Sequence, residues 1–181
     1  MCIDKNNTNN ELLLCFDESG NIVASEPRGV IHQKPIHVWH AVSNIWVMNK
    51  NGQLLCTMRA EHVSGNGGKW QTYVGGHVKA NSNYIETAKR EIKEEIGLRI
   101  SSNSLQLIDR GRREDVMHFY ESYAVLIKID IPKLNFNDGE ISKAQWISFD
   151  NYLKFKEEEP DMWCNGINET QYKKIIKTLG I

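Results

Sequence analysis

The sequence predicts an α+β or mixed α/β protein built on one β-sheet with two or three helices. Two observations carry this prediction. Short apolar segments bounded by turn residues, among them Asn51-Gly52, indicate strands joined by hairpins. Residues 84–96 instead have helical composition and stop before Gly97, a typical helix C-cap residue.

The expected elements follow the same logic along the chain. Short apolar runs predict strands at 12–16, 22–24, 41–48, 53–58, 70–74, 104–108, 118–129 and 144–148. Helical composition predicts helices at 84–96 and 169–179, and a short helical piece that begins at 152–155. No repeat or long linker divides the 181 residues, so we expect one domain over residues 11–181 after a flexible tail at 1–10.

Composition and charge exclude several classes of function. Lys and Arg total 22 against 23 Asp and Glu, a net charge of -1, so specific nucleic-acid binding is not expected. No apolar run approaches the ~18 residues of a membrane span, which predicts a cytoplasmic protein without a membrane partner. The four cysteines form no C-x-x-C pair, so we expect Cys15 and Cys56 to be buried thiols.

Three glutamates crowd the second half of the predicted 84–96 helix. Glu91, Glu94 and Glu95 are spaced i, i+3 and i+4 and therefore share an arc of its surface. The buried stripe beside them is expected to consist of Ile85, Ala88, Ile92 and Ile96. Carboxylates near a helix C-terminus oppose its dipole, and hard divalent cations prefer carboxylate oxygens. The residues alone leave open a solvated acidic face or a Mg²⁺ site.

Histidines form a second cluster in the sequence. His32, His37 and His40 lie within nine residues, around the helix breaker Pro35. An extended segment does not bring these rings together by itself. Metal ligation there would require tertiary folding and stays open at this point.

Residues 76–98 resemble the Nudix box, G-x5-E-x7-R-E-U-x-E-E-x-G-U, where U is aliphatic. Arg90-Glu91, Glu94-Glu95 and Gly97 match the pattern, whereas Ser82 stands where the family has its first glutamate. The flanking segments are similar to the Nudix subgroup nearest isopentenyl-diphosphate isomerases, so the likeness covers residues 11–155. The resemblance implies the Nudix fold, an α/β/α sandwich with a mixed sheet.

The resemblance also implies an activity. Nudix proteins mostly use Mg²⁺ or Mn²⁺ to hydrolyse small pyrophosphate-containing substrates, usually nucleotides, and often form dimers. By similarity, the metal ligands are Gly76, Glu91, Glu94 and Glu95. The implied catalytic residues are Glu91, Glu94 and Glu140, with Glu121 as a further candidate base. The implied substrate contacts are Arg59, Gly75 and His77.

The departure at Ser82 bears on this assignment. We expect Arg90 to orient the acidic side chains, and we hypothesise that Glu86 replaces the missing brace as an i, i+4 partner of Arg90. An alternative function is an inert Nudix ligand-binding module. A less favoured one is an isomerase, because His32, His40 and His77 sit where isomerases bind metal, but Gly75 occupies the place of their catalytic cysteine.

Overall fold

One long strand organises the sheet. β3 (Trp39–Met48) pairs antiparallel with β1 (Leu12–Phe16), β4 (Leu54–Arg59) and β6 (Val74–His77), and parallel with β8 (His118–Leu126). The sheet is therefore mixed, as the resemblance to the Nudix box implies. The computed structural model describes residues 9–63, 65–136 and 138–181, so most of the expected tail at 1–10 lies outside the described residues.

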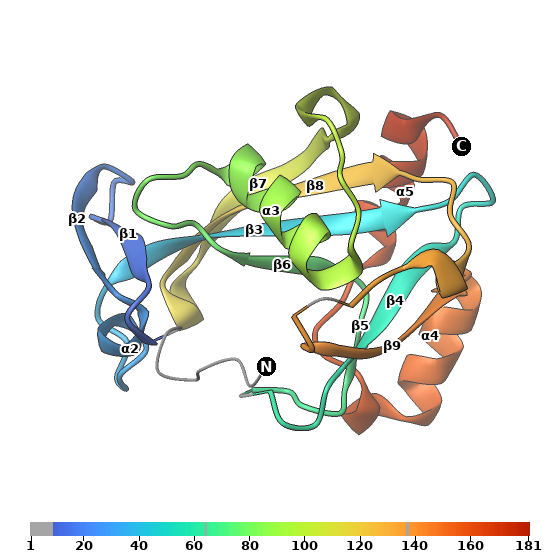
Figure 1. Cartoon of the computed structure of the whole chain (residues 1–181), viewed down its shortest axis with the longest axis horizontal. Coiled ribbons are helices and arrows are strands. Elements are labelled where there is room, and N and C mark those ends of the chain that lie inside the picture. Colours follow the sequence, from blue (N-terminus) through green and yellow to red (C-terminus); the bar gives the residue numbers. More distant parts are fainter. Residues whose placement is uncertain (1–8, 64, 137) are drawn as a thin grey trace.

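The remaining strands extend this sheet on both sides (Figure 1). β2 (Ile22–Pro27) pairs with β1, and β7 (Gln106–Arg113) pairs with β8. β5 (Trp70–Gln71) and β9 (Ile141–Ile147) both pair with β4. One sequence prediction is wrong here. The strand predicted at 70–74 is two strands, because β5 hydrogen-bonds to β4 and β6 hydrogen-bonds to β3.

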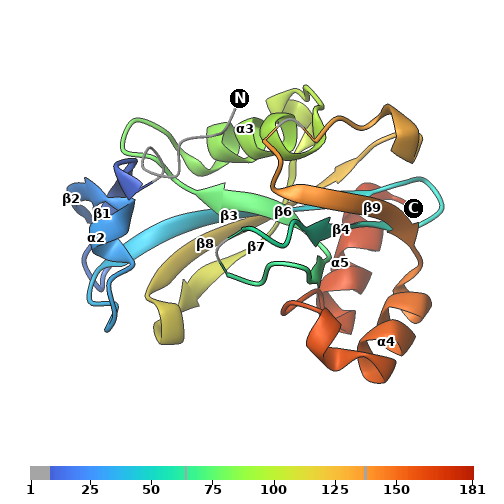
Figure 2. The same ribbon diagram turned by 60° about the horizontal axis from the view of Figure 1, so that its bottom comes forward.

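Helices cover both faces of the sheet (Figure 2). α3 (Tyr84–Ile96) lies on one face and buries Ala88, Ile92 and Ile96 in one hydrophobic cluster. α4 (Phe149–Glu158) and α5 (Glu169–Leu179) lie on the other and enclose a second cluster. This is the expected α/β/α sandwich. A short helix that the sequence did not indicate, α2 (Arg28–Ile31), follows β2.

The ends of α3 follow the local sequence. The Asn83 side chain accepts a hydrogen bond from the Glu86 backbone N–H, and Gly97 takes the left-handed conformation at the other end (φ 77°). The expected apolar stripe is wrong at Ile85, which is 38% exposed, whereas Glu95 is buried. The packing of α3 on the sheet thus moves a carboxylate into the interior.

Two further expectations concern burial and membranes. Cys15 and Cys56 are buried thiols, as predicted. Among the described residues, no helix is both long enough and apolar enough to cross a membrane.

Candidate active site

The buried glutamate of α3 is the centre of the site. Glu95 accepts a hydrogen bond from the Gly75 backbone N–H to Oε1 (2.9 Å), and its other oxygen, Oε2, has no partner among the described residues. Only 4% of Glu95 is exposed. A buried carboxylate oxygen without a partner is costly, because it has lost its water. A cation bound at this oxygen would remove that cost.

Glu91 lies beside Glu95 and against the backbone of β6. A Cβ atom added to Gly76 would lie 2.2 Å from Glu91 Oε1, so the glutamate occupies the space that any side chain at position 76 would fill. Glycine at this position therefore lets the carboxylate approach the strand. Gly76 and Glu91 thus lie together, while their role as metal ligands stays a prediction.

Arg90 connects the acidic side chains to the strand. Its guanidinium pairs with Glu91 (2.6 Å) and with Glu94 (2.8 Å), and Nη2 also donates to the carbonyl oxygen of His77 (3.2 Å). Arginine presents several donors in a rigid plane, which suits such a three-way contact. The expected role of Arg90 as an orienting residue fits these contacts.

The carboxylates of the site carry more negative charge than Arg90 neutralises. Burial raises the pKa of Glu91 to about 7; Arg90 opposes the shift, while Glu94, Glu140 and Glu11 add to it. Burial and then Glu91 also raise the pKa of Glu95 well above its usual range. Desolvation and like charges both disfavour the ionised form, and a divalent cation reverses both effects. Carboxylates in this arrangement fit Mg²⁺ or Mn²⁺, which take oxygen ligands.

A loop before β9 contributes further groups. Glu140 forms an ion pair with Arg59 (3.7 Å), and its charge contributes to the raised pKa values of Glu91 and Glu95. Asp138, which the sequence did not single out, accepts a hydrogen bond from the Glu140 N–H (2.9 Å). Burial first, then Glu140 and Glu94, raises the pKa of Asp138. The only sequence signal for Asp138 was its place in the Asp-Gly turn before the strand.

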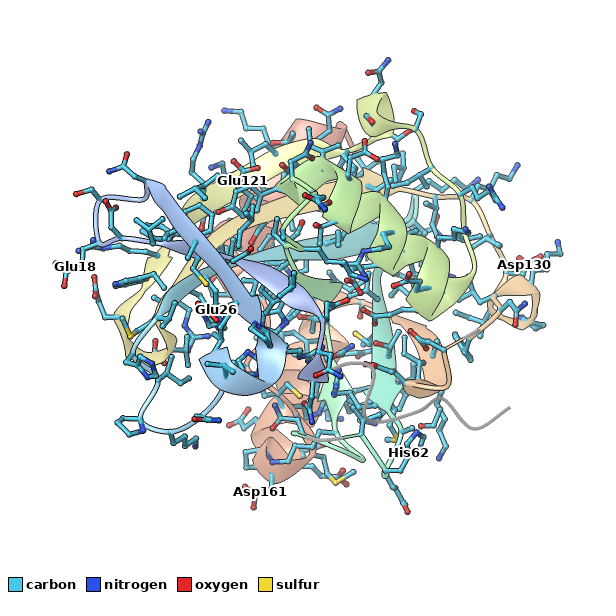
Figure 3. The ribbon with its side chains drawn as sticks, turned by 60° about the vertical axis from the view of Figure 1, so that its left-hand side comes forward. Glu18, Glu26, His62, Glu121, Asp130 and Asp161 are labelled. Carbon is cyan, nitrogen blue, oxygen red and sulfur yellow. The ribbon has the colours of Figure 1, made fainter. Side chains whose placement is uncertain are left out.

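Glu121 lies elsewhere on the sheet (Figure 3). It is on β8 beside the first turn of α3, whereas Glu91, Glu94 and Glu95 occupy the second half of that helix. Tyr123 donates its hydroxyl hydrogen to Glu121. The carboxylate also lines a cavity of about 280 Å³, together with Tyr84, Arg110, Gly111, Arg112, Phe119 and Tyr120. Of the two additional candidate bases, Glu140 is the one whose charge acts on the carboxylate cluster.

Comparison with known proteins places this site in a family. Residues 38–163 match the family described as NUDIX domain. The chain belongs to the Nudix family. Nudix hydrolase 3 of Arabidopsis thaliana is 25% identical over 163 residues, which are 84% of this chain and 21% of the plant protein. The chain thus spans about a fifth of the length of that relative.

Two further likenesses extend the Nudix assignment. The isopentenyl-diphosphate Delta-isomerase of Pectobacterium atrosepticum is 27% identical over 135 residues, covering 69% of this chain and 72% of the isomerase. The crystal structure of DR0079 from Deinococcus radiodurans superposes with a TM-score of 0.71 at 20% identity, covering 91% of this chain and 99% of DR0079. The structural likeness shows that the fold is shared.

The departure from the Nudix box at Ser82 has a structural outcome. The Ser82 hydroxyl lies 3.4 Å from the Thr87 hydroxyl at the start of α3. Our hypothesis that Glu86 takes over the brace is wrong, because the Glu86 carboxylate binds Lys89 Nζ (3.0 Å) rather than Arg90. Arg90 is instead anchored on the His77 carbonyl, Glu91 and Glu94.

Three histidines lie close together on the face of β6 that points away from α3. His32, His40 and His77 each offer a ring nitrogen, and these three atoms lie within 4.8 Å of one another. His37, which the sequence grouped with His32 and His40, lies outside the cluster, with its Nδ1 3.2 Å from the Pro35 carbonyl oxygen. His77 replaces it. The His77 ring lies in this cluster and the Gly75 N–H is bound to Glu95, so their role as substrate contacts stays a prediction.

Proposed function

We propose that this Nudix protein is a Mg²⁺-dependent hydrolase of a small pyrophosphate-containing substrate, with a nucleoside triphosphate or a nucleoside diphosphate-linked compound as the substrate class. The observation that carries the proposal is the unpartnered, buried Oε2 of Glu95 inside a cluster of carboxylates. Glu91, Glu94, Glu95 and the Gly76 carbonyl would hold the metal. When bound, Mg²⁺ lowers the pKa of a coordinated water and offsets negative charge that develops at phosphorus.

Other side chains would orient the metal ligands, bind the substrate and accept a proton. Arg90 orients Glu91 and Glu94 and ties both to the backbone of His77. Arg59, whose contact with Glu140 is long at 3.7 Å, exchanges this contact for a phosphate oxygen of the substrate, as guanidinium groups commonly do. Glu140, once released from Arg59, accepts the proton of the attacking water at its carboxylate. Glu91 is the alternative base, and the two assignments predict different variants to be inactive.

An isomerase is disfavoured although relatives carry that name. The sequence places Gly75 where isomerases have a catalytic cysteine, and a Cβ atom added to Gly75 would lie 2.2 Å from the backbone oxygen of Ser43. Any side chain at this position would therefore displace strand β3 or β6. The close packing of β3 against β6 therefore leaves no room for a cysteine side chain at position 75.

The decisive experiment measures phosphate or pyrophosphate release from a panel of nucleoside triphosphates, nucleoside diphosphates and nucleotide sugars with and without Mg²⁺. We expect Mg²⁺-dependent turnover of at least one member by the unmodified chain, and loss of that turnover in Glu94→Gln. The matched control is Glu86→Gln, an exposed glutamate on the same helix that pairs with Lys89. Tight nucleotide binding without turnover would instead support the inert-module alternative.

The same panel distinguishes the two candidate bases. If Glu140 accepts the proton, Glu140→Gln lowers kcat by about 100-fold or more at saturating Mg²⁺ while Mg²⁺ affinity changes little. If Glu91 does, Glu91→Gln has that effect and also weakens Mg²⁺ binding. Metal affinity measured by calorimetry therefore separates a proton acceptor from a metal ligand.

A further inference from the structure

The proposed hydrolysis leaves the cavity beside β7 and β8 unused. It has a volume of about 280 Å³, and the residues that line it include Tyr84 at the start of α3, Arg110 of β7, and Phe119 and Glu121 of β8. Ligand pockets in proteins usually measure about 300–1,000 Å³. This cavity is near the lower end of that range and therefore suits a small ligand.

The register of the strands places the cavity apart from the carboxylates. Ser43 of β3 pairs with Gly76 of β6 on one side and with Glu121 of β8 on the other. Neighbouring strands lie about 4.8 Å apart, so about 10 Å of sheet separates Glu121 from Gly76, against which Glu91 packs. The helix α3 crosses these strands, with its start beside β8 and its second half against β6 (Figure 1). The cavity and the carboxylates are thus at opposite ends of α3.

Two opposite charges line the cavity without forming an ion pair. Arg110 and Glu121 are directly opposite on neighbouring strands, where oppositely charged side chains commonly pair. The Glu121 carboxylate instead accepts the hydroxyl hydrogen of Tyr123, a residue that is 3% exposed. The Arg110 guanidinium has neither a hydrogen bond nor an ion pair in the part of the chain that the structure describes. The core therefore holds the carboxylate in place, and the guanidinium stays available for a ligand.

Aromatic rings supply the apolar walls. Phe119 is fixed by packing against Phe16, with ring centroids 5.6 Å apart, and against Trp39, at 5.0 Å. Tyr84 adds a ring from the first turn of α3. Burial and then Glu121 raise the pKa of Tyr84 to about 12, so its hydroxyl stays protonated at neutral pH. Aromatic walls of this kind favour a flat ring that stacks on them.

The other lining arginine, Arg112, is already occupied. Its Nη1 donates to the carbonyl oxygen of Glu18 (2.9 Å), and its Nε pairs with Glu114 (2.7 Å). Its guanidinium also lies 5.4 Å from the centroid of the Trp39 ring. These contacts hold the turn between β1 and β2 beside the cavity. Of the two lining arginines, Arg110 is therefore the one that is available for an anion.

The chemistry of the walls describes one kind of ligand. The aromatic rings require a flat ring, the carboxylate of Glu121 requires hydrogen-bond donors, and Arg110 requires an anionic group. Guanine presents a ring N–H and an amino group side by side, and both can donate to one carboxylate. Adenine presents a ring nitrogen acceptor beside its amino group, and this lone pair would repel the carboxylate. A guanine nucleotide carries the anion as its phosphate.

We propose that the cavity binds a guanine mononucleotide, with the base between Tyr84 and Phe119, its two donors on Glu121 and its phosphate on Arg110. This nucleotide would be a ligand in addition to the substrate of the proposed hydrolase, because the cavity and the carboxylates are at opposite ends of α3. The inference does not depend on the proposed function.

The first experiment titrates guanosine monophosphate into the full chain by calorimetry in the presence of a metal chelator. A monophosphate has no pyrophosphate bond to be hydrolysed, and the chelator removes any divalent cation from the carboxylate site. We expect one nucleotide per chain, and binding of adenosine monophosphate that is weaker by at least about tenfold, since a charged group would lose its hydrogen bonds. No binding of guanosine monophosphate, or equal affinity for both nucleotides, would overturn the proposal.

The second experiment tests the two charged residues separately. Glu121→Gln should weaken guanosine monophosphate binding by at least about tenfold and remove the preference over adenosine monophosphate. Arg110→Gln should weaken binding of guanosine monophosphate but not of guanosine, which has no phosphate. The matched control is Arg113→Gln, an arginine of the same strand that pairs with Asp115 and does not line the cavity. Equal affinities for guanosine monophosphate in Arg110→Gln and Arg113→Gln would contradict the phosphate contact.

One further variant separates this proposal from the proposed hydrolysis. Glu94→Gln, which should abolish turnover, is expected to bind guanosine monophosphate as the unmodified chain does. Loss of nucleotide binding in this variant would show that the nucleotide occupies the carboxylate site and would overturn the separate site. Lack of turnover by the unmodified chain would count against the hydrolase alone, because binding in the cavity is measured without metal.

Discussion

Two different groups of possible metal ligands lie against the two faces of strand β6. Toward α3, Glu91, Glu94 and Glu95 supply oxygen atoms from a single helix within five residues. On the other face, His32, His40 and His77 supply nitrogen atoms from three elements, and His77 lies 45 residues from His32. The first group requires only a helix. The second requires that the sheet assemble in the right order.

The two groups also differ in their chemistry. The carboxylates repel one another and would be stabilised by a cation, whereas burial lowers the pKa of His40 and so favours the neutral ring. A change that moves one group should therefore affect catalysis, and a change that moves the other should affect stability. Four predictions make use of this contrast.

The largest expected effect is on activity at the carboxylate site. Gly76→Ala places a methyl group where Glu91 Oε1 now lies, at 2.2 Å from the added Cβ. Because the displaced group is the end of a flexible side chain, stability should change little, but a displacement of about 1 Å can lower the rate about 100-fold. Steady-state kinetics and urea unfolding measure the two effects. Unchanged kcat/KM would mean that the position of Glu91 is not important for the reaction.

The histidine face should lose stability in acid. Burial, then His40 and Arg113, lowers the pKa of His118 to about 3 from 6.5. Its folded pKa lies below the unfolded value, so stability is full above pH 6.5 and falls as the pH drops from 6.5 toward 3. We expect a loss of about 2 to 3 kcal/mol from His118.

The measurement is urea unfolding between pH 7 and pH 4 of the unmodified chain and of His118→Gln. The Gln variant cannot take up this proton and should lose less stability over the same range. The pKa values of Glu91 and Glu95 are raised in both proteins, so the contributions of these two residues to the pH dependence of stability cancel in the difference. Parallel curves for the two proteins would contradict the prediction.

Gly75→Ala should have a smaller effect than the two changes above, and this effect should be on the free energy of unfolding as well as on activity. The added Cβ would lie 2.2 Å from the Ser43 backbone oxygen, and a backbone atom cannot move aside as a side chain can. We expect the pairing of β3 with β6 to weaken by about 2 kcal/mol, as overpacking typically does. Gly76→Ala is the matched neighbour, and equal destabilisation by the two alanines would contradict the distinction drawn between them.

The smallest effect should come from Glu86→Gln. This side chain is exposed and pairs only with Lys89, three residues away, in the contacts of the described residues. Such pairs contribute about 0.2 to 0.5 kcal/mol, so Tm should change slightly and kcat/KM should not change. A large loss of activity would restore Glu86 as the functional partner of Arg90 and would contradict the observed anchoring of Arg90 on His77.

The success of sequence-based prediction differs between the elements. The helices at 84–96 and 169–179 were predicted with their observed bounds, because capping residues and helical composition are local properties. The prediction of a single strand at 70–74 was wrong. This segment forms β5, which pairs with β4, and β6, which pairs with β3, and such pairing depends on which strands become neighbours in the fold. Ile85 was placed in the core for a similar reason: periodicity gives the apolar side of a helix but not its tilt on the sheet.

The sequence by itself determined the acidic half of the site. Glu91, Glu94 and Glu95 lie together because 3.6 residues complete one turn, whatever the rest of the chain does. Only the tertiary structure decided that Glu95 is buried on the Gly75 N–H, that Arg90 is anchored on His77 rather than on Glu86, and that His37 faces Pro35 instead of the other histidines. These contacts join segments that are distant in the chain, and their formation depends on the order and register of strands around β3.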